Sequence, residues 1–266
     1  MKKIGFIGIG NMGYPMLCGA IQSFGMDEVT YTSATLKHMQ EMKEKTGVDY
    51  IIELEELIQN CQILVLAVKP QQLEEVAKKL EGHLKKEQIV VSCIVSVTIK
   101  DIKQRLGEKT RIVRIMPNTP AMVKEGMTEL CYSDDEFTKE EQTIIEKLLD
   151  SFGHFCMIPE KLMDAAVCAS GSSPAYVYLF IEALADSAVK YGIPRKTAYE
   201  MAAQTVLGAA KMVLETELHP GILKDAVCSP GGTTIAGVSA LEQNGFRSAI
   251  IAATDACYQR AIQLKE

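Results

Sequence analysis

Residues 3–13 read KIGFIGIGNMG, a short apolar run that leads straight into a cluster of glycines. The run is typical of a buried first strand, and the glycines follow it in the spacing GxGxxG, where an amphipathic helical stretch begins. In that context the first glycine permits a tight turn, the second lets the backbone approach a pyrophosphate, and the third lets the helix pack close to the strand. The alternative is a glycine turn that binds no ligand. We expect a dinucleotide to bind by its phosphates at this helix start, on Gly8, Ile9, Gly10, Asn11, Met12 and Gly13.

Around this stretch, the first half of the chain alternates β-like runs with amphipathic helical stretches. The expected strands are Lys3–Ile9, Glu28–Thr32, Ile63–Val68, Ile89–Ser92, Arg111–Met116, Met127–Tyr132 and His154–Ile158. The expected helices include Met12–Phe24, Leu36–Lys45, Gln71–Leu80 and Lys139–Phe152. The run at 63–68 is apolar throughout, which is typical of a strand covered by helices on both faces. The alternation predicts an α/β domain over residues 1–160, with a doubly wound, parallel sheet of the Rossmann type.

The second half has a different character, because Ala, Leu, Met, Val and Glu dominate it and it contains no convincing strand pattern. The expected helices are Lys161–Ala169, Pro174–Tyr191, Pro194–Glu217, Thr233–Asn244 and Phe246–Leu264. We therefore expect residues 161–266 to form an all-helical domain. Helices this apolar need more partners than a small monomeric domain supplies. We expect a homodimer through this domain, or a larger homo-oligomer of such dimers.

Composition excludes several classes of protein. Lys plus Arg number 28 and Asp plus Glu number 34, which gives a net charge of −6 and no electrostatic footprint for nucleic acid. No apolar run is long enough to span a bilayer. The eight cysteines form no CxxC pair and the four histidines are scattered, so we expect buried thiols and no metal site. Because the chain starts as a strand rather than a signal peptide, we expect a cytoplasmic protein.

The choice of dinucleotide depends on the end of the second expected strand. The sequence there is YTSATLK at 31–37, and it contains no acid that could hold the ribose 2′-hydroxyl of NAD. Ser33, Lys37 and a helix start could accept a 2′-phosphate instead. NADPH is therefore expected to be preferred, with NADH as the alternative. The competing role for Ser33 is a simple helix N-cap.

Several segments, in the same order along nearly the whole chain, resemble pyrroline-5-carboxylate reductases. They are IGIGNMG (7–13), LAVKPQ (66–71), RIMPNTP (114–120), GSSPAYVYLFIEALADSAVKYG (171–192) and SPGGTT (229–234) followed by LEQNGFRSAIIAA (241–253). The resemblance implies an oxidoreductase that reduces 1-pyrroline-5-carboxylate to L-proline with NAD(P)H, the last step of proline biosynthesis. A protonated cyclic imine is already a good hydride acceptor, so the protein must mainly orient two molecules and bind a carboxylate.

The same resemblance implies that the substrate carboxylate lies on the SPGGTT turn. Gly231 and Gly232 would leave backbone N–H groups accessible there. The helix that starts at Thr233 adds further donors, and Ser229 adds a hydroxyl. Thr234 matches the family threonine whose hydroxyl lies beside the imine nitrogen, so it is the candidate for polarising the imine or relaying a proton. The alternative is a glycine-rich helix start that Ser229 and Thr233 cap.

Two further loops follow expected strands, at the edge where open α/β sheets bind ligands. The resemblance implies that Ala67, Val68, Lys69 and Pro70 line the cofactor, with Lys69 near the active site. It also places the loop that contains Asn118 against the nicotinamide and ribose. The competing roles are a solvated surface charge for Lys69 and a tight turn for Asn118.

Three other functions compete with imine reduction. The β-hydroxyacid dehydrogenases pair similar domains, but they need a proton-transfer lysine on the first long helix of the second domain, and residues 170–187 contain no lysine. Reduction of pyrroline-2-carboxylate or a larger cyclic ketimine is compatible with the same residues. A non-catalytic dinucleotide sensor has no need of a carboxylate site, so the SPGGTT segment disfavours it.

Overall fold

The computed structural model describes residues 2–264, and its internal contacts divide the chain into two compact units. The first comprises the described residues up to Ser172 and those from Tyr258 onward, and the second runs from Ser173 to Cys257. The segment between residue 160, where the domain boundary is predicted, and Ser172 groups with the first unit. Met163 in that segment is buried in the core of the first unit.

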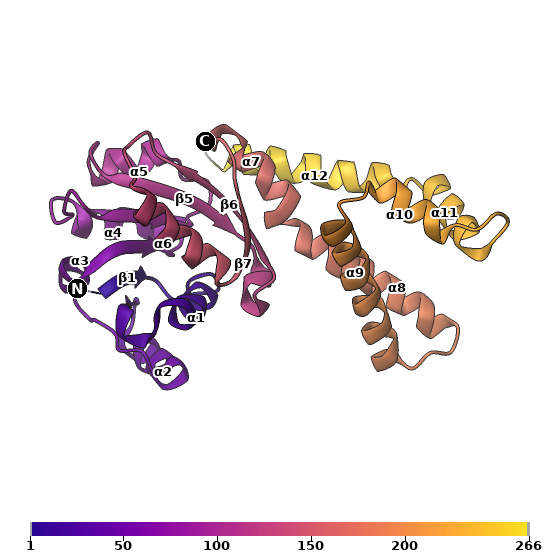
Figure 1. Ribbon diagram of the computed structural model, residues 1–266, viewed down its shortest axis with the longest axis horizontal. Coiled ribbons are helices and arrows are strands. Elements are labelled where there is room, and N and C mark those ends of the chain that lie inside the picture. The colour runs from indigo at the N-terminus through magenta and orange to yellow at the C-terminus, as the bar shows by residue number, and fades with distance from the viewer. Residues whose placement is uncertain (1, 265–266) are drawn as a thin grey trace. The chain divides into compact units, whose positions relative to one another are not determined.

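One sheet of seven strands, counted within residues 2–264, forms the first unit (Figure 1). The strands are β1 (Lys2–Ile7), β2 (Val29–Thr32), β3 (Cys61–Leu66), β4 (Ile89–Ser92), β5 (Arg111–Pro117), β6 (Gly126–Tyr132) and β7 (Gly153–Met157). Each overlaps a predicted strand. Their order across the sheet is β2-β1-β3-β4-β5-β6-β7. The strand β2 therefore lies on one side of β1, and β3 lies on the other side. Open sheets bind ligands at the carboxyl ends of strands where the order switches in this way.

Helices cover both faces of the sheet. They are α1 (Gly13–Phe24), α2 (Leu36–Thr46), α3 (Leu54–Asn60), α4 (Leu73–Leu80), α5 (Ile99–Leu106), α6 (Lys139–Asp150) and α7 (Met163–Ala166). Successive strand residues point to opposite faces. Ile63 and Val65 of β3 therefore pack in one core cluster with α1, α2 and α6, whereas Leu64 and Leu66 pack in the other with α3, α4 and α5. This arrangement confirms the predicted doubly wound α/β fold and explains the apolar run along β3.

The strand β6 departs from the prediction of a wholly parallel sheet. It pairs antiparallel with β5, so that Ile115 lies opposite Leu130, and β7 then runs parallel to β6. The cause is the short connection at 118–125, since a parallel crossover needs a dozen residues or more. This connection contains the 3-10 turn η3 (Thr119–Val123) and returns the chain directly alongside β5.

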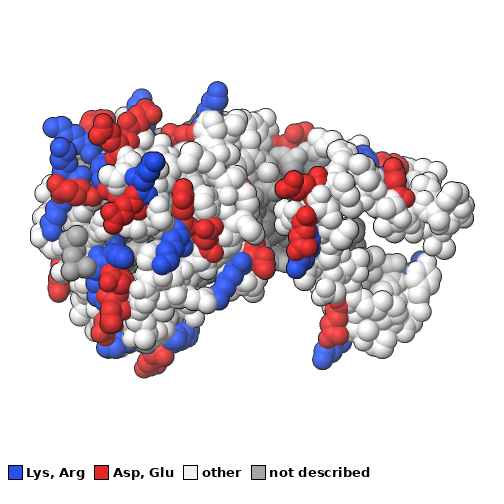
Figure 2. All heavy atoms as spheres, in the orientation of Figure 1, with Lys and Arg blue, Asp and Glu red and all other residues white. Residues whose placement is uncertain are grey.

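The second unit contains helices and no strand among its described residues. Its helices are α8 (Ser173–Lys190), α9 (Arg195–Thr216), α10 (Pro220–Val227), α11 (Thr233–Gln243) and most of α12 (Phe246–Gln263). Its buried cluster is small, with three alanines from the α8–α9 hairpin at its centre: Ala185, Ala198 and Ala202. On the face drawn in Figure 2, charged side chains crowd the first unit and are sparser over the second.

Two of the helices, α3 and α5, and the short helix α10 have no counterpart among the predicted segments. A local signal does mark the start of α5. The Thr98 hydroxyl accepts from the Asp101 N–H at 3.1 Å, and the Asp101 carboxylate accepts from the Thr98 N–H at 2.8 Å. This reciprocal pair is a capping box, which is readable in sequence as T-x-x-D.

Within residues 2–264, no helix combines the length and the apolarity needed to cross a membrane. The same residues hold no group of three or more His, Cys, Asp or Glu side chains placed to bind a metal ion. No disulfide joins the eight cysteines, all of which lie in the described part of the chain. Cys61, Cys131 and Cys168 are buried, and the other five are half-buried rather than buried as predicted.

Candidate active site

The glycine motif forms the turn between β1 and α1. Gly8 has a φ of +93°, and its N–H donates to the Thr32 carbonyl at 3.0 Å. A Cβ at Gly8 would lie 2.8 Å from the Ala67 carbonyl oxygen, so this turn requires glycine. A Cβ at Gly13 would collide with the Gly8 carbonyl oxygen, because α1 packs close to the strand. Around a Cβ at Gly10, by contrast, nothing among the described residues other than its chain neighbours lies within 4 Å, which is the condition for a phosphate to approach the backbone.

The start of α1 is suited to an anion. Its N-cap, Met12, offers no capping side chain, and the first turn of this described helix holds no acidic residue. The first N–H groups of a helix have no acceptor inside the helix, and they carry its positive dipole end. A phosphate would therefore meet hydrogen-bond donors and favourable charge at the same point.

A cavity of about 640 Å³ opens where β1, β2 and β3 end, at the switch in strand order. Of the residues predicted to bind the cofactor, it is lined by Gly8, Ile9, Gly10, Ser33, Ala67, Val68 and Lys69. The others lie outside its lining: Asn11, Met12, Gly13, Pro70 and Asn118. Sequence reasoning missed several further lining residues, among them Leu36, His38, Glu53, Glu55, Gln72 and Lys79. They escaped notice because α2, α3 and α4 converge on this edge only in the folded chain.

At the end of β2, Ser33 faces the cavity without capping α2. The N-cap is Thr35, whose Oγ1 accepts from the His38 N–H at 3.3 Å. The Ser33 Oγ lies instead 2.9 Å from Nδ1 of His38, and both residues line the cavity. The competing role of Ser33 as a simple N-cap is therefore wrong.

The loop after β3 forms another wall of the cavity. The Ala67 N–H donates to the Ile7 carbonyl at 2.9 Å, which holds the loop beside the end of β1. Lys69 then precedes the 3-10 turn η2 (Pro70–Gln72), and its N–H donates to the Gln72 Oε1 at 3.2 Å. Lys69 itself is exposed at the cavity, so its ammonium group is available to a ligand there.

Asn118 is held inside the first unit and is 8% exposed. Its Nδ2 donates to the Ser170 carbonyl at 3.0 Å, and its Oδ1 accepts from the Met127 N–H at 2.9 Å. Ser170 belongs to the π-helical turn η5 (Val167–Gly171), and its hydroxyl donates to Oε1 of Glu129 at 2.6 Å. The Asn118 side chain thus ties the loop after β5 to β6 and to this turn.

Glu129 is the buried acid of this network. It is 5% exposed, and its Oε2 has no hydrogen-bond partner among residues 2–264. Burial raises the pKa of Glu129, while the hydrogen bond from Ser170 opposes that rise. Sequence reasoning missed this residue, although an acid inside the apolar strand MTELCY was a signal that could have been used.

The SPGGTT segment forms a turn and the start of α11. The Gly232 N–H donates to the Ser229 carbonyl at 3.0 Å, with Pro230 second and Gly231, at a φ of +69°, third, which is the pattern of a type II turn. Gly232 is the N-cap of α11, and no side chain caps this described helix start. The alternative of caps by Ser229 and Thr233 is therefore wrong. The first N–H groups of α11 stay available to an anion.

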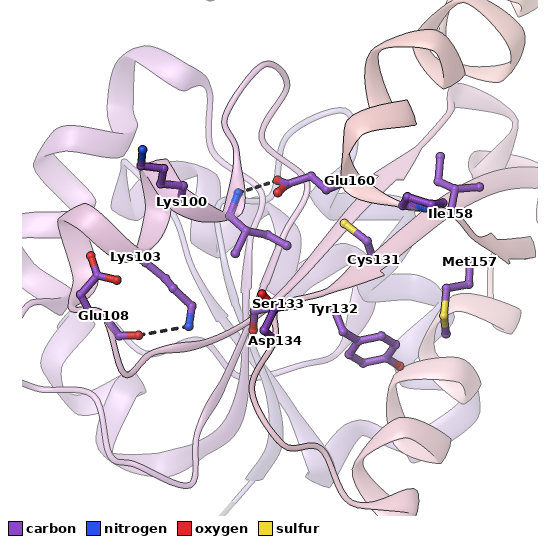
Figure 3. Close-up of a pocket in the computed structure, with 12 residues that line it drawn as sticks. Lys100, Lys103, Glu108, Cys131, Tyr132, Ser133, Asp134, Met157, Ile158 and Glu160 are labelled. Carbon is purple, nitrogen blue, oxygen red and sulfur yellow. Dashed lines mark hydrogen bonds between the residues drawn. The ribbon is translucent and has the colours of Figure 1, made fainter.

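A larger cavity of the first unit, about 870 Å³, lies over α5, β6 and the end of β7 (Figure 3). It is lined by none of the residues predicted for the site. Its Glu160 carboxylate accepts from the Ile99 N–H at 2.6 Å and pairs with Arg114 at 3.0 Å. Its Lys103 pairs with Asp135 at 2.6 Å. The charges of Glu160 and Lys103 are therefore balanced by neighbouring groups. The glycine turn, which a phosphate can approach, lies at the smaller cavity, which is the candidate site.

Two family-level sequence patterns match the chain. The family described as pyrroline-5-carboxylate reductase dimerisation matches residues 160–264. The family described as NADP oxidoreductase, coenzyme F420-dependent, matches residues 3–96. The two matches fall on the helical and the sheet-forming parts of the chain.

Individual relatives match over the full length. The pyrroline-5-carboxylate reductase of Escherichia coli strain K12 is 42% identical, over 100% of this chain and 99% of that protein. The solved reductase of Coxiella burnetii is 35% identical with a TM-score of 0.90, over 100% of this chain and 99% of that one. That of Plasmodium falciparum, solved with NADP bound, is 31% identical with a TM-score of 0.88, over 100% and 98%. The chain therefore belongs to the pyrroline-5-carboxylate reductase family.

Proposed function

We propose that this chain reduces 1-pyrroline-5-carboxylate to L-proline, the last step of proline biosynthesis, with NADPH as preferred hydride donor and NADH as the alternative. The observation that carries the proposal is the 42% identity to the E. coli reductase over the whole chain. That match spans the glycine turn at the sheet and the SPGGTT turn before α11, the two turns to which the proposal assigns the cofactor and the substrate.

The first unit fits a nicotinamide dinucleotide, which supplies the hydride when bound. The open space at Gly10 admits a pyrophosphate, and the backbone of Gly8 to Gly13 provides the donors. Ile9, which is 2% exposed, acts through its backbone because its side chain belongs to the core. Ala67, Val68, Lys69 and Pro70 form the wall along the cofactor. Asn118 serves the cofactor site chiefly by holding its own loop, since both polar atoms of its side chain bond within the first unit.

The SPGGTT turn holds the substrate carboxylate in this proposal. Its support is the uncapped start of α11, where Thr233 and the residues after it present N–H groups. Gly231 and Gly232 leave no side chain over those donors, and the exposed Ser229 adds a hydroxyl. A carboxylate at this point would also gain from the helix dipole.

Thr234 stands in the first turn of α11 and is half-buried. We assign its hydroxyl to the imine nitrogen, where it orients the ring and relays the proton that the nitrogen needs. The carbon of the imine, whose nitrogen is protonated, accepts the hydride, and the nitrogen keeps its proton as the amine of proline. The hydroxyl contributes modestly, because a substrate can arrive already protonated.

The enzyme acts as a cytoplasmic homodimer that its helical domains form, or as a larger oligomer of such dimers. The support is the family match at 160–264 and the apolar side chains left at the surface of the second unit. Examples are Leu179, Leu207 and Leu214, which are 66%, 53% and 74% exposed. Large exposed apolar surfaces mark interaction sites, so we assign this one to the interface with a second copy of the chain.

The test is steady-state oxidation of NADPH and of NADH by the purified protein, with pyrroline-5-carboxylate and, in parallel, pyrroline-2-carboxylate. The proposal expects turnover with pyrroline-5-carboxylate and a higher kcat/KM for NADPH. If the folded protein binds NADPH but oxidises it only with pyrroline-2-carboxylate, then that isomer is the substrate in place of pyrroline-5-carboxylate. The absence of turnover with either imine would refute a reductase.

A further inference from the structure

We propose that His38, held by Ser33, is the residue that selects NADPH over NADH by binding the 2′-phosphate. This rests on the proposed function, because it requires a dinucleotide in the 640 Å³ cavity. Lys37, the cation that the sequence suggested for this role, is exposed and lies outside the cavity lining, whereas Ser33 and His38 both belong to it.

The pair leaves one hydrogen-bond donor unused in either tautomer, and both of its residues line the cavity. Ser33 Oγ and His38 Nδ1 are 2.9 Å apart, so one of them donates to the other. If Nδ1–H donates, the Ser33 hydroxyl remains free to donate outward. If the hydroxyl donates, Nε2 carries the ring's proton and becomes the outward donor.

The start of α2 adds to this site. Thr35 caps the helix by accepting from the His38 N–H, which fixes His38 in the first turn beside the end of β2. The N–H groups of Leu36 and Lys37 have no acceptor within the helix, and they lie at its positive end. A 2′-phosphate at the end of β2 would thus meet backbone donors and the Ser33–His38 pair together.

The other charges that line the cavity do not provide this discrimination. They are three acids and two lysines: Glu53, Glu55, Glu75, Lys69 and Lys79. Lys79 lies 3.4 Å from Glu75, so part of its charge is already balanced. Lys69 follows β3, on a different strand from the ribose-binding end of β2. Against this acidic lining, the donors at the end of β2 decide whether a phosphate dianion is accepted.

The test measures Kd for NADPH and NADH by fluorescence titration, and for 2′-AMP and 5′-AMP by calorimetry, in the full-length protein. We expect His38→Ala to lower the affinity for NADPH and for 2′-AMP by about tenfold to a hundredfold, because a charge-assisted hydrogen bond is lost. The affinities for NADH and 5′-AMP should not change. His38→Gln, which keeps a neutral donor, should lose less. Lys37→Ala tests the rival residue, and Lys45→Ala, at the far end of α2, is the matched control.

If His38→Ala weakened the binding of NADPH and of NADH equally, the proposal would be overturned, because the residue would then only support the fold. A selective loss in Lys37→Ala would transfer the role to that lysine. Wild-type protein that binds 5′-AMP as tightly as 2′-AMP would also overturn it. AMP binding requires no turnover. A chain that discriminates 2′-AMP through His38 yet fails to reduce the imine would therefore support this inference while refuting the proposed reaction.

Discussion

The two units of the chain differ in how much of their apolar side-chain surface is buried. In the first, two large clusters pack on the faces of the sheet, with side chains such as Phe6, Leu57 and Phe152 fully buried. In the second, the buried cluster centres on three alanines, while Leu179, Leu207 and Leu214 stay at the surface. Burial of apolar area is the main favourable term in folding. The first unit therefore contains a large core of its own, and the proposed dimer would supply the second with the apolar partner surface it lacks.

The same contrast separates the two binding features. The cavity proposed for the cofactor lies inside one unit, at the ends of three strands whose side chains pack in its core. The SPGGTT turn lies at the start of a helix in the unit that lacks a large core of its own. If the proposed dimer forms, cofactor binding should survive its dissociation, whereas catalysis should not. Four substitutions test this difference, in order of decreasing effect on activity.

The largest effect is expected at Gly10. Gly10→Val places a branched side chain where the pyrophosphate approaches, in space that is open in the protein. We expect NADPH affinity to fall by about a thousandfold, through the loss of several charge-assisted hydrogen bonds, with an unchanged Tm. Gly13→Val is the contrasting variant, because its Cβ collides with Gly8 and should lower the Tm. Unchanged NADPH affinity in folded Gly10→Val would show that the motif is only a turn.

The next effect concerns the dimer. Leu207→Asp puts a charge on the exposed apolar surface of α9. If a second copy covers that surface, the buried charge should weaken dimerisation by about a hundredfold or more and reduce turnover with it, while NADPH still binds. Light scattering measures dimerisation, and cofactor titration measures NADPH binding. Gln204→Asp, a polar and exposed position on the same helix, is the control and should stay dimeric. Fully active monomers would contradict the account of the second unit.

Thr234→Val is expected to have a smaller effect, since it deletes the hydroxyl and keeps the shape. Turnover should fall by about tenfold to a hundredfold, the lower range for a positioned proton-transfer group. Affinity for NADPH should not change, because the proposed function places this residue at the substrate and not at the cofactor. Thr234→Ser should restore most of the rate. Wild-type turnover of the Val variant at neutral and alkaline pH would leave Thr234 with a structural role alone.

Glu141→Gln should leave turnover unchanged and affect the stability of the first unit alone. The Arg111 guanidinium pairs with Glu141 and lowers the pKa of that carboxyl from its ordinary value of about 4.5 to about 2. A lowered pKa stabilises the fold above the unfolded value, and the contribution disappears as pH falls toward 2. Urea unfolding should show a loss of about 3 kcal/mol at pH 7 that vanishes between about pH 4 and pH 2. A loss independent of pH would mean that packing, and not the ion pair, is responsible.

Much of this molecule was predictable from sequence because local patterns determine it. The apolar run at 63–68 gave a central strand, and the GxGxxG spacing gave the turn into α1. The antiparallel β6 was not predicted, although the eight-residue connection at 118–125 excludes a parallel crossover. Loop length was a usable signal there, as was the capping box of α5.

The parts that escaped prediction depend on contacts between distant residues. Asn118 bonds to Ser170, 52 positions away, so its side chain is committed in a manner that no local pattern reveals. Ser33 contacts His38, five positions away, while Thr35 between them is the N-cap of α2. The predicted residues Gly231 to Thr234 do form an uncapped helix start. Their contact with substrate remains a prediction.

The most direct test of the central claim follows the hydride itself. Turnover of pyrroline-5-carboxylate with NADPH deuterated at nicotinamide C4, on the face that is transferred, should give proline with one deuterium on C5, the former imine carbon. Mass spectrometry and NMR of the product would locate it. The account predicts one deuterium for each NADPH oxidised. Proline without deuterium at C5, or oxidation of NADPH without formation of proline, would contradict it.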